Sequence, residues 1–142
     1  MKTIEDIMTK SILMIDVDAK VHDAAEMLEK HKIGSLVVTE GKETIGIVTE
    51  RDITYRYVAR PKREICGADL LVRDIMSKPL ISLSIDANPN IMDVIVMMDK
   101  HKIKRVCITK KGKLVGVLAE LDLFKELADS YVKDLKKMIS KL

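Results

Sequence analysis

The segment Gly46-Ile-Val-Thr-Glu-Arg-Asp52 returns later in the chain as Gly116-Val-Leu-Ala-Glu-Leu-Asp122. Near the start of the chain, Asp6-Ile-Met-Thr-Lys10 returns in the same way as Asp74-Ile-Met-Ser-Lys78. Across 33 consecutive pairs that begin at position 21, a constant offset of 70 keeps ten identities in register. The chain therefore contains two copies of one structural unit.

The first half of each copy predicts an amphipathic helix, because apolar residues recur three and four positions apart. Asp18 is the expected N-cap in the first copy. In the second copy, Asn88 is the expected N-cap and Pro89 the first helical residue. The apolar positions are Val21, Ala24, Ala25 and Leu28 in the first copy and Ile91, Val94, Ile95 and Met98 in the second.

Two β-branched runs follow each helix, and a short polar turn with glycine joins them. This pattern predicts a β-hairpin, and a second helix is expected to start near Glu50 or Glu120. One β-α-β-β-α copy has too small a core to be stable alone, so we expect an α+β fold in which two copies pack sheet to sheet as a pseudo-twofold pair. The predicted strands are 35–39 and 45–48 in the first copy and 105–109 and 114–118 in the second.

The domain organisation follows from the repeat. We assign residues 1–66 to the first copy and its connector, 67–124 to the second copy, and 125–142 to a C-terminal helix. Pro61 and Gly67 mark the connector. Apolar residues recur every three or four positions up to Leu142, so the C-terminal helix is amphipathic and either covers its own domain or seals a dimer.

The composition is typical of a globular protein, with 47% hydrophobic and 33% charged residues. No apolar run reaches the roughly 20 residues of a membrane-spanning helix, and the N-terminus lacks a secretory pattern, so we expect a cytoplasmic protein that does not bind membranes. Abundant Lys and Glu without Gln or Trp favour a thermophilic source. The net charge of +3 is concentrated in the second half of the chain, which suits a phosphate-bearing ligand or a nucleic acid.

We find no catalytic motif, and we predict that the chain is not an enzyme and has no metal site. His31 and His101 lie at equivalent helix ends, where a polar residue has a structural use. Cys66 and Cys107 have no metal-binding or redox spacing and are expected to be free, buried thiols. The acidic pair Glu50 and Asp52 recurs as Glu120 and Asp122. A pair that is present in both copies indicates two binding sites rather than one active site.

A nucleotide-binding chemistry follows from residues that recur near the second helix of each copy. Gly46 and Gly116 have no side chain, so either a ligand or another segment of the chain can lie close to their backbone. The helix N-terminus that follows is favourable for anions. Asp52 can accept two hydrogen bonds from a diol, and Lys102, Lys104 and Arg105 form a basic cluster on the solvated surface or at the ligand.

The order of these motifs, with His31-Lys-Ile33 repeated as His101-Lys-Ile103, closely resembles a tandem pair of CBS (cystathionine β-synthase-type) domains. The resemblance covers the chain up to the terminal helix. It implies a regulatory or sensor module with two clefts between the sheets. No obligatory cofactor is implied; the regulatory ligand would be AMP, ADP, ATP or S-adenosylmethionine, and binding would be signalled by a change of conformation or partner.

The resemblance also implies the ligand-binding residues. The second cleft is expected to be the weaker phosphate site, because Ala119 and Leu121 replace the Thr and Arg of the first copy. The first cleft would use Thr49, Arg51, Asp52, Ser77, Lys78, Leu80, Ile103, Lys104 and Arg105. The second would use Thr9, Lys10, Ser11, Ile12, Ile33, Gly34, Ser35 and Asp122.

The same resemblance implies a homodimer through the helices beside the clefts, together with an unknown effector protein. The sequence is also compatible with a second class of function. The basic second half would then serve an adaptor that binds a partner protein or, less favoured by the scarcity of aromatic residues, a nucleic acid.

Overall fold

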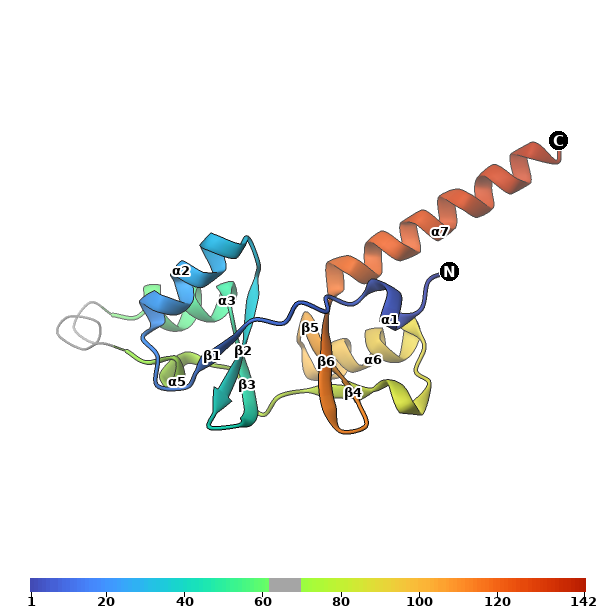
Figure 1. The fold of residues 1–142 in the computed structure, drawn as a ribbon. Coiled ribbons are helices and arrows are strands. Elements are labelled where there is room, and N and C mark those ends of the chain that lie inside the picture. Colours follow the sequence, from blue (N-terminus) through green and yellow to red (C-terminus); the bar gives the residue numbers. More distant parts are fainter. Residues whose placement is uncertain (62–69) are drawn as a thin grey trace. The chain divides into compact units, whose positions relative to one another are not determined.

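A computed structural model of the protein describes residues 1–61 and 70–142 and divides into two compact units (Figure 1). The first unit is Ile12–Ile81, and the second combines Met1–Ser11 with Ser82–Leu142. Cys66 and most of the predicted connector lie outside the described residues. Each unit holds one three-stranded sheet with helices, so the predicted α+β class and the predicted β-α-β-β-α order are confirmed.

In the first unit the strand order is β1-β2-β3, with β1 parallel and β3 antiparallel to β2. A parallel pair needs a crossover, which α2 provides, whereas the antiparallel pair is a hairpin. Helices α3 and η1, a π-helix, continue directly from β3. The bounds are β1 Met14–Asp16, α2 Val21–His31, β2 Ser35–Glu40, β3 Glu43–Thr49, α3 Glu50–Ile53, η1 Thr54–Val58 and α5 Val72–Ile75.

The second unit repeats this topology with the strand order β4-β5-β6, and both hairpins shift register at the equivalent position. It begins with the short N-terminal helix α1 and ends with the long helix α7. The bounds are α1 Ile4–Ile7, β4 Ser82–Ser84, η2 Ile85–Ala87, α6 Ile91–His101, β5 Arg105–Lys110, β6 Lys113–Ala119 and α7 Glu120–Ser140.

The repeated His-Lys-Ile segment ends the helix in both units. Lys32 and Lys102 adopt the left-handed conformation at φ 52° and 53°. The next residue in each repeat donates its N–H back to the helix, from Ile33 to Leu28 O at 3.1 Å in the first unit. This is a Schellman-type ending, which satisfies carbonyls that the helix itself leaves open. The His-Lys-Ile segment is thus repeated because both copies need it to end the helix.

The predicted N-caps are wrong by two residues. Lys20 holds the N-cap position of α2, and Asn90 that of α6. The Asn90 side chain accepts from Asp93 N at 3.0 Å, and Asp93 Oδ2 accepts from Asn90 N at 2.8 Å. This reciprocal capping box outcompetes a cap at Asn88, which instead ends η2 in a left-handed conformation.

The leading helices of the two repeats are exchanged between the units. Helix α5 opens the second repeat but packs Val72 and Ile75 into the core of the first unit. Helix α1 opens the first repeat, but its Ile4 and the C-cap residue Met8 pack into the core of the second unit. The compact units therefore do not coincide with the consecutive sequence copies 1–66 and 67–124.

Candidate functional site

The end of β3 and the start of α3 form a capping box in the first unit. Thr49 is extended and serves as the N-cap of α3. Its hydroxyl accepts from Asp52 N at 3.2 Å, and Asp52 Oδ2 accepts from Thr49 N at 3.0 Å. A Thr followed three residues later by an acid predicts this arrangement, because both side chains satisfy open N–H groups of the first turn. The box fixes the Asp52 carboxylate at the helix start.

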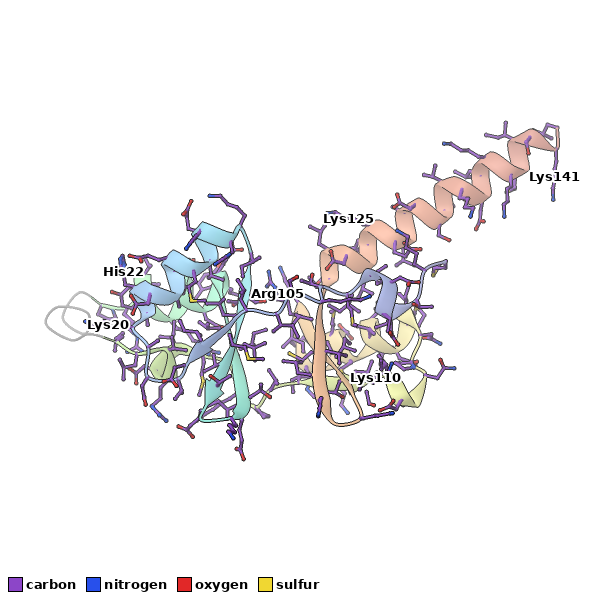
Figure 2. All side chains as sticks on the ribbon, in the orientation of Figure 1. Lys20, His22, Arg105, Lys110, Lys125 and Lys141 are labelled. Carbon is purple, nitrogen blue, oxygen red and sulfur yellow. The ribbon has the colours of Figure 1, made fainter. Side chains whose placement is uncertain are left out.

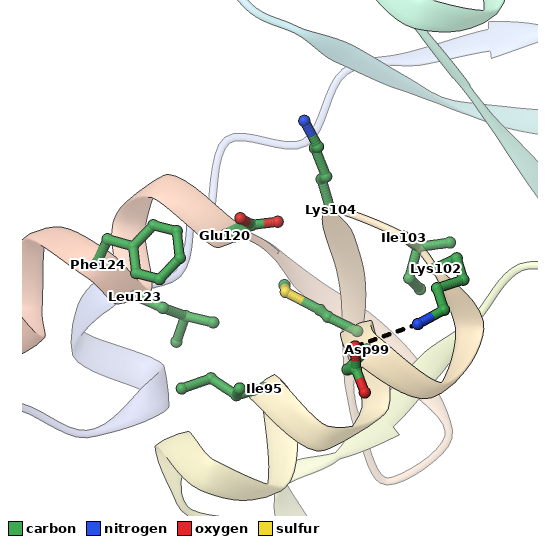
Figure 3. Close-up of a pocket in the computed structure, with 9 residues that line it drawn as sticks. Ile95, Asp99, Lys102, Ile103, Lys104, Glu120, Leu123 and Phe124 are labelled. Atoms are coloured by element: carbon green, nitrogen blue, oxygen red, sulfur yellow. Dashed lines mark hydrogen bonds and ion pairs between the residues drawn. The ribbon is translucent and has the colours of Figure 1, made fainter.

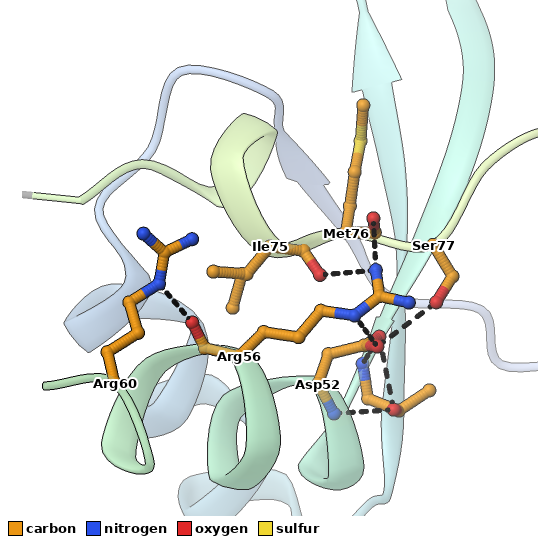
Figure 4. A network of polar contacts seen from close by, with 7 residues as sticks. Asp52, Arg56, Arg60, Ile75, Met76 and Ser77 are labelled. Atoms are coloured by element: carbon orange, nitrogen blue, oxygen red, sulfur yellow. Dashed lines mark hydrogen bonds and ion pairs between the residues drawn. The ribbon is translucent and has the colours of Figure 1, made fainter.

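Ser77 brings a second hydroxyl to this carboxylate from a distant part of the sequence. Ser77 Oγ donates to Asp52 Oδ1 at 3.0 Å, while Thr49 Oγ1 donates to Asp52 Oδ2 at 3.1 Å (Figure 4). Asp52 retains only 5% exposure, which is unusual for an acid. Each carboxylate oxygen is thus held by a hydroxyl donor.

Arg56 completes the network from η1 and supplies the opposite charge. Its Nη1 donates to the carbonyl oxygens of Ile75 and Met76 at 3.2 and 3.0 Å, and its Nε lies 3.7 Å from Asp52 Oδ1. A buried carboxylate needs such a partner. Our sequence analysis missed Arg56, although its position four residues after Asp52 on a helix was a usable signal. We define Thr49, Asp52, Arg56 and Ser77 as the Asp52 site.

Gly46 allows the Ser77 segment to lie against β3. Ser77 N donates to Ile47 O at 2.8 Å, and Ile47 N donates to Ser77 O at 3.0 Å. A Cβ on Gly46 would stand only 2.6 Å from Ser77 O. Of the two uses that the sequence left open for this glycine, the structure shows chain packing, which in turn positions the Ser77 hydroxyl.

The equivalent place in the second unit has a different chemistry. Thr9 pairs with Val117 through backbone hydrogen bonds of 2.9 and 3.0 Å, as Ser77 pairs with Ile47. Asp122 Oδ2 accepts a long bond of 3.4 Å from Ala119 N, where the first unit has a threonine. Glu126 stands in place of Arg56, is 7% exposed, and accepts from Lys2 N at 2.8 Å. An acid thus replaces the cation of the Asp52 site.

The remaining residues predicted for the first cleft are divided between the two units, and their common role stays a prediction. Arg51 is exposed, and its guanidinium carbon lies 5.2 Å from the centre of the Tyr55 ring, a cation–π geometry. Lys78 is also exposed, and Leu80 is half-buried. The other three belong to the second unit, at the end of α6 and the start of β5: Ile103, Lys104 and Arg105.

The residues predicted for the second cleft are divided between the units, and their common role stays a prediction. Thr9, Lys10, Ser11 and Asp122 belong to the second unit. Ile12, Ile33, Gly34 and Ser35 belong to the first unit, where Gly34 O accepts from Glu50 N at 3.1 Å.

The second unit also has an apolar hollow of about 360 Å³ between α6 and α7 (Figure 3). Met98 and Leu123 are its most buried lining residues, and Ile95, Ile103 and Phe124 also line it. Lys102 and Asp99 form an ion pair of 3.3 Å at its rim. Lys104 and Glu120 also line the hollow, so a mainly apolar wall carries a few charged side chains at its edge.

Three further observations bear on the predicted chemistry. Cys107 is free and buried, as predicted, and burial raises the pKa of its thiol to about 11. Within residues 1–61 and 70–142, no three His, Cys, Asp or Glu side chains gather in a way that would hold a metal ion. No helix in the same ranges has both the length and the apolar character to cross a bilayer.

Comparison with known proteins places both repeats in one family. The CBS domain model matches residues 4–59 and 72–129. The chain is 30% identical over 125 residues to the CBS domain-containing protein YhcV of Bacillus subtilis, which covers 87% of this chain and 84% of that protein. A CBS-domain structure from Burkholderia ambifaria, described as a signal-transduction protein, has a TM-score of 0.78 and 24% identity, covering 89% of this chain and 93% of that one.

A hexameric CBS-CP12 protein from bloom-forming cyanobacteria has the same fold. Its TM-score is 0.73 at 26% identity, over 87% of this chain and 70% of that one. The repeat in sequence, the repeated topology and the two matched segments agree with one another. The chain belongs to the CBS-domain family and carries two CBS domains in tandem.

Proposed function

We propose that this chain is a regulatory module, not an enzyme, and that the Asp52 site binds an adenosine-containing ligand such as AMP, ADP, ATP or S-adenosylmethionine. The observation that carries the proposal is the buried Asp52 carboxylate. The hydroxyls of Thr49 and Ser77 donate to it, and the Arg56 guanidinium lies beside it. This arrangement suits a ribose hydroxyl and a nearby negative charge.

The hydrogen-bond capacity of Asp52 sets how a ribose would bind. A carboxylate has about four acceptor directions. Thr49 occupies both directions on Oδ2 through its N–H and its hydroxyl, and Ser77 occupies one on Oδ1. Arg56 Nε lies 3.7 Å from Oδ1, too far for a hydrogen bond, so one ribose hydroxyl can bind at Oδ1 beside the guanidinium. A second ribose hydroxyl requires the Ser77 hydroxyl to give up its bond, so ligand and Ser77 compete for Asp52.

Arg56 supplies the charge for a phosphate. Its Nη1 and Nε face Ile75, Met76 and Asp52, and within the described residues nothing accepts from its Nη2. The side chain is 52% exposed, so the Nη2 donors can reach a ligand in solvent. A planar guanidinium with two free donors matches phosphate oxygens.

The Asp122 position is expected to prefer a ligand without phosphate. Asp122 has no hydroxyl partner at Ala119, and Glu126 adds a second negative charge where the first unit has Arg56. Two acids near one place repel a phosphate. The proposed ranking of the two sites thus rests on Arg56 and Glu126 as well as on Thr49.

The competition at Ser77 suggests how binding would be signalled. Ser77 begins the stretch of chain that leads to Ser82, where the second unit resumes. A ligand that replaces the Ser77 hydroxyl on Asp52 would favour an arrangement of this stretch in which Ser77 no longer donates to Asp52 over the arrangement in which it does. A ligand shifts a conformational equilibrium only by such a difference in affinity.

Calorimetry with AMP, ADP, ATP and S-adenosylmethionine tests the proposal. Asp52→Asn should weaken AMP binding by about 10- to 100-fold, since a hydrogen bond to a charged group contributes about 1.5–3 kcal/mol. Asp122→Asn is the matched control and should leave AMP affinity within about twofold. Wild-type affinity in Asp52→Asn, with an unchanged thermal transition, would overturn the assignment of the site.

The adaptor hypothesis has a different signature. Binding of a nucleic acid through Lys and Arg weakens steeply as salt rises, whereas a nucleotide sensor is stabilised against heat by its ligand. The homodimer predicted through helices beside the sites remains part of the proposal, and the apolar hollow between α6 and α7 supports a helix contact there. A thermal-shift panel combined with a gel shift separates the sensor from the adaptor.

A further inference from the structure

Helix α7 extends beyond the body of the second unit. Leu123 and Glu126, in its first two turns, are buried, and Leu127 packs against the core. Every residue from 131 to 142 is exposed. Figure 2 shows the side chains of this distal part standing free of the unit; Lys125 marks the proximal part of α7, and Lys141 the far end. A helix of this length without packing is marginal in water.

The distal part nevertheless carries an apolar stripe. The exposed fractions are 65% for Tyr131, 65% for Met138 and 67% for Ile139. We define the α7 stripe as the exposed apolar residues that recur along one face with alternating steps of three and four. Its members are Leu121, Phe124, Ala128, Tyr131, Leu135, Met138 and Leu142, and Val132 and Ile139 flank it.

The α7 stripe lies on a different face from the one that packs on the unit. At about 100° per residue, Glu126 lies on the opposite side of the helix from Leu135, and Leu123 lies about 120° away from it. The unit therefore covers one face of α7 and leaves the stripe open along the whole helix. A repeat of three and four is the pattern of a helix that packs against another helix.

The charges along α7 identify the partner. Residues 120–131 hold four acids and one lysine, whereas residues 132–142 hold four lysines and one acid. Two copies aligned in parallel would place like charges together, and two antiparallel copies would place each basic half beside an acidic half. A twofold antiparallel contact is self-complementary, as a symmetric dimer requires.

We propose that the α7 stripe pairs antiparallel with the same stripe of a second copy of this chain. The contact is separate from the Asp52 site and from the hollow between α6 and α7, although Phe124 borders both the hollow and the stripe. It buries the apolar residues of the distal helix and so stabilises the part that lacks intrachain packing. The chain would then dimerise through its terminal helix whether or not a nucleotide is bound.

Sedimentation of the full chain tests the proposal. The wild type should be a dimer at micromolar concentration. Leu135→Glu, which places a charge in the centre of the stripe, should raise the dissociation constant at least tenfold. Ser140→Glu adds the same charge on the opposite face and is the matched control, with a dissociation constant within about threefold of wild type. A monomeric wild type, or equal dissociation constants for Leu135→Glu and wild type, overturns the proposal.

Spin labels test the orientation. With a cysteine at Ser140 in a Cys66→Ser background, antiparallel helices that overlap over their whole length separate the two labels by about 30 Å along the axis. Labels closer than about 15 Å would show parallel helices and contradict the antiparallel arrangement. Unchanged thermal unfolding of each variant shows that the units remain folded.

Discussion

Gly46→Ala tests how the Asp52 site is assembled. The new Cβ would lie 2.6 Å from the carbonyl oxygen of Ser77 and 3.3 Å from Met76 Sδ. The carbonyl oxygen cannot move alone, because the Ser77 backbone makes two hydrogen bonds with Ile47, of 2.8 and 3.0 Å. The whole Ser77 segment must therefore move away from β3, and its hydroxyl moves away from Asp52.

The expected loss of stability is about 2 kcal/mol. Overpacking costs about 1–3 kcal/mol, and weakening the hydrogen bonds of Ser77 adds about 1 kcal/mol. Gly46 does not have a positive φ, so alanine also restricts the unfolded chain and recovers about 0.4–1 kcal/mol. We also expect weaker AMP binding, because the displaced segment carries the carbonyls of Ile75 and Met76, which hold Arg56 in place for the phosphate.

Gly116→Ala is the matched control in the second unit. Its new Cβ would meet the side chain of Met8, with Sδ at 2.4 Å and Cγ at 2.8 Å, and not a backbone atom. A rotamer change of a flexible thioether costs about 0.5–1.5 kcal/mol, so the net effect should stay within about 1 kcal/mol. Urea denaturation followed by circular dichroism measures both variants. Equal losses, or a larger loss for Gly116→Ala, would refute the packing argument.

Three further predictions concern single residues. Ser77→Ala should strengthen AMP binding about two- to tenfold in calorimetry, because it frees an acceptor on Asp52; a tenfold loss would show that the hydroxyl itself binds the ligand. Arg56→Ala should weaken AMP about tenfold while leaving adenosine unchanged, and equal losses for both would contradict a phosphate contact. Because burial raises the pKa of Cys107 to about 11, the folded thiol stays protonated where an unfolded thiol ionises; the free energy of unfolding should thus fall as pH rises from about 9 to 11, and Cys107→Ala should remove this fall.

Much of the fold was predictable because it is encoded locally. The hairpins, the helices and their order follow from the spacing of apolar residues and from glycine in the turns. The capping box of Thr49 and Asp52 is also local, since the two residues are three positions apart at a helix start. The N-caps were misplaced, because Asn88 and Asn90 both have a suitable side chain and only Asn90 has an acid three residues later.

Only part of the Asp52 site is formed by residues that are close together in the sequence. Ser77 lies 25 residues from Asp52, and its place in the prediction came from family resemblance, not from spacing. Arg56 was missed because an acid and a base four residues apart on a helix are common on solvated surfaces. Its importance depends on the burial of Asp52 and on the carbonyls of Ile75 and Met76, which only the folded chain brings together.

The sequence by itself determined that one unit is present twice and that the copies differ at Thr49 and Ala119. Only the tertiary structure decided which leading helix packs with which sheet. Both sheets have similar apolar faces, and the spacing of apolar residues in a helix does not specify which face it packs against. The tertiary structure likewise decided that Arg56 lies beside the buried Asp52 carboxylate, and that Glu126 at the equivalent position of the second copy is buried and accepts from Lys2 N. Hydrophobic burial is non-directional, so local pattern gives the elements, and long-range hydrogen bonds and shape determine which of them meet.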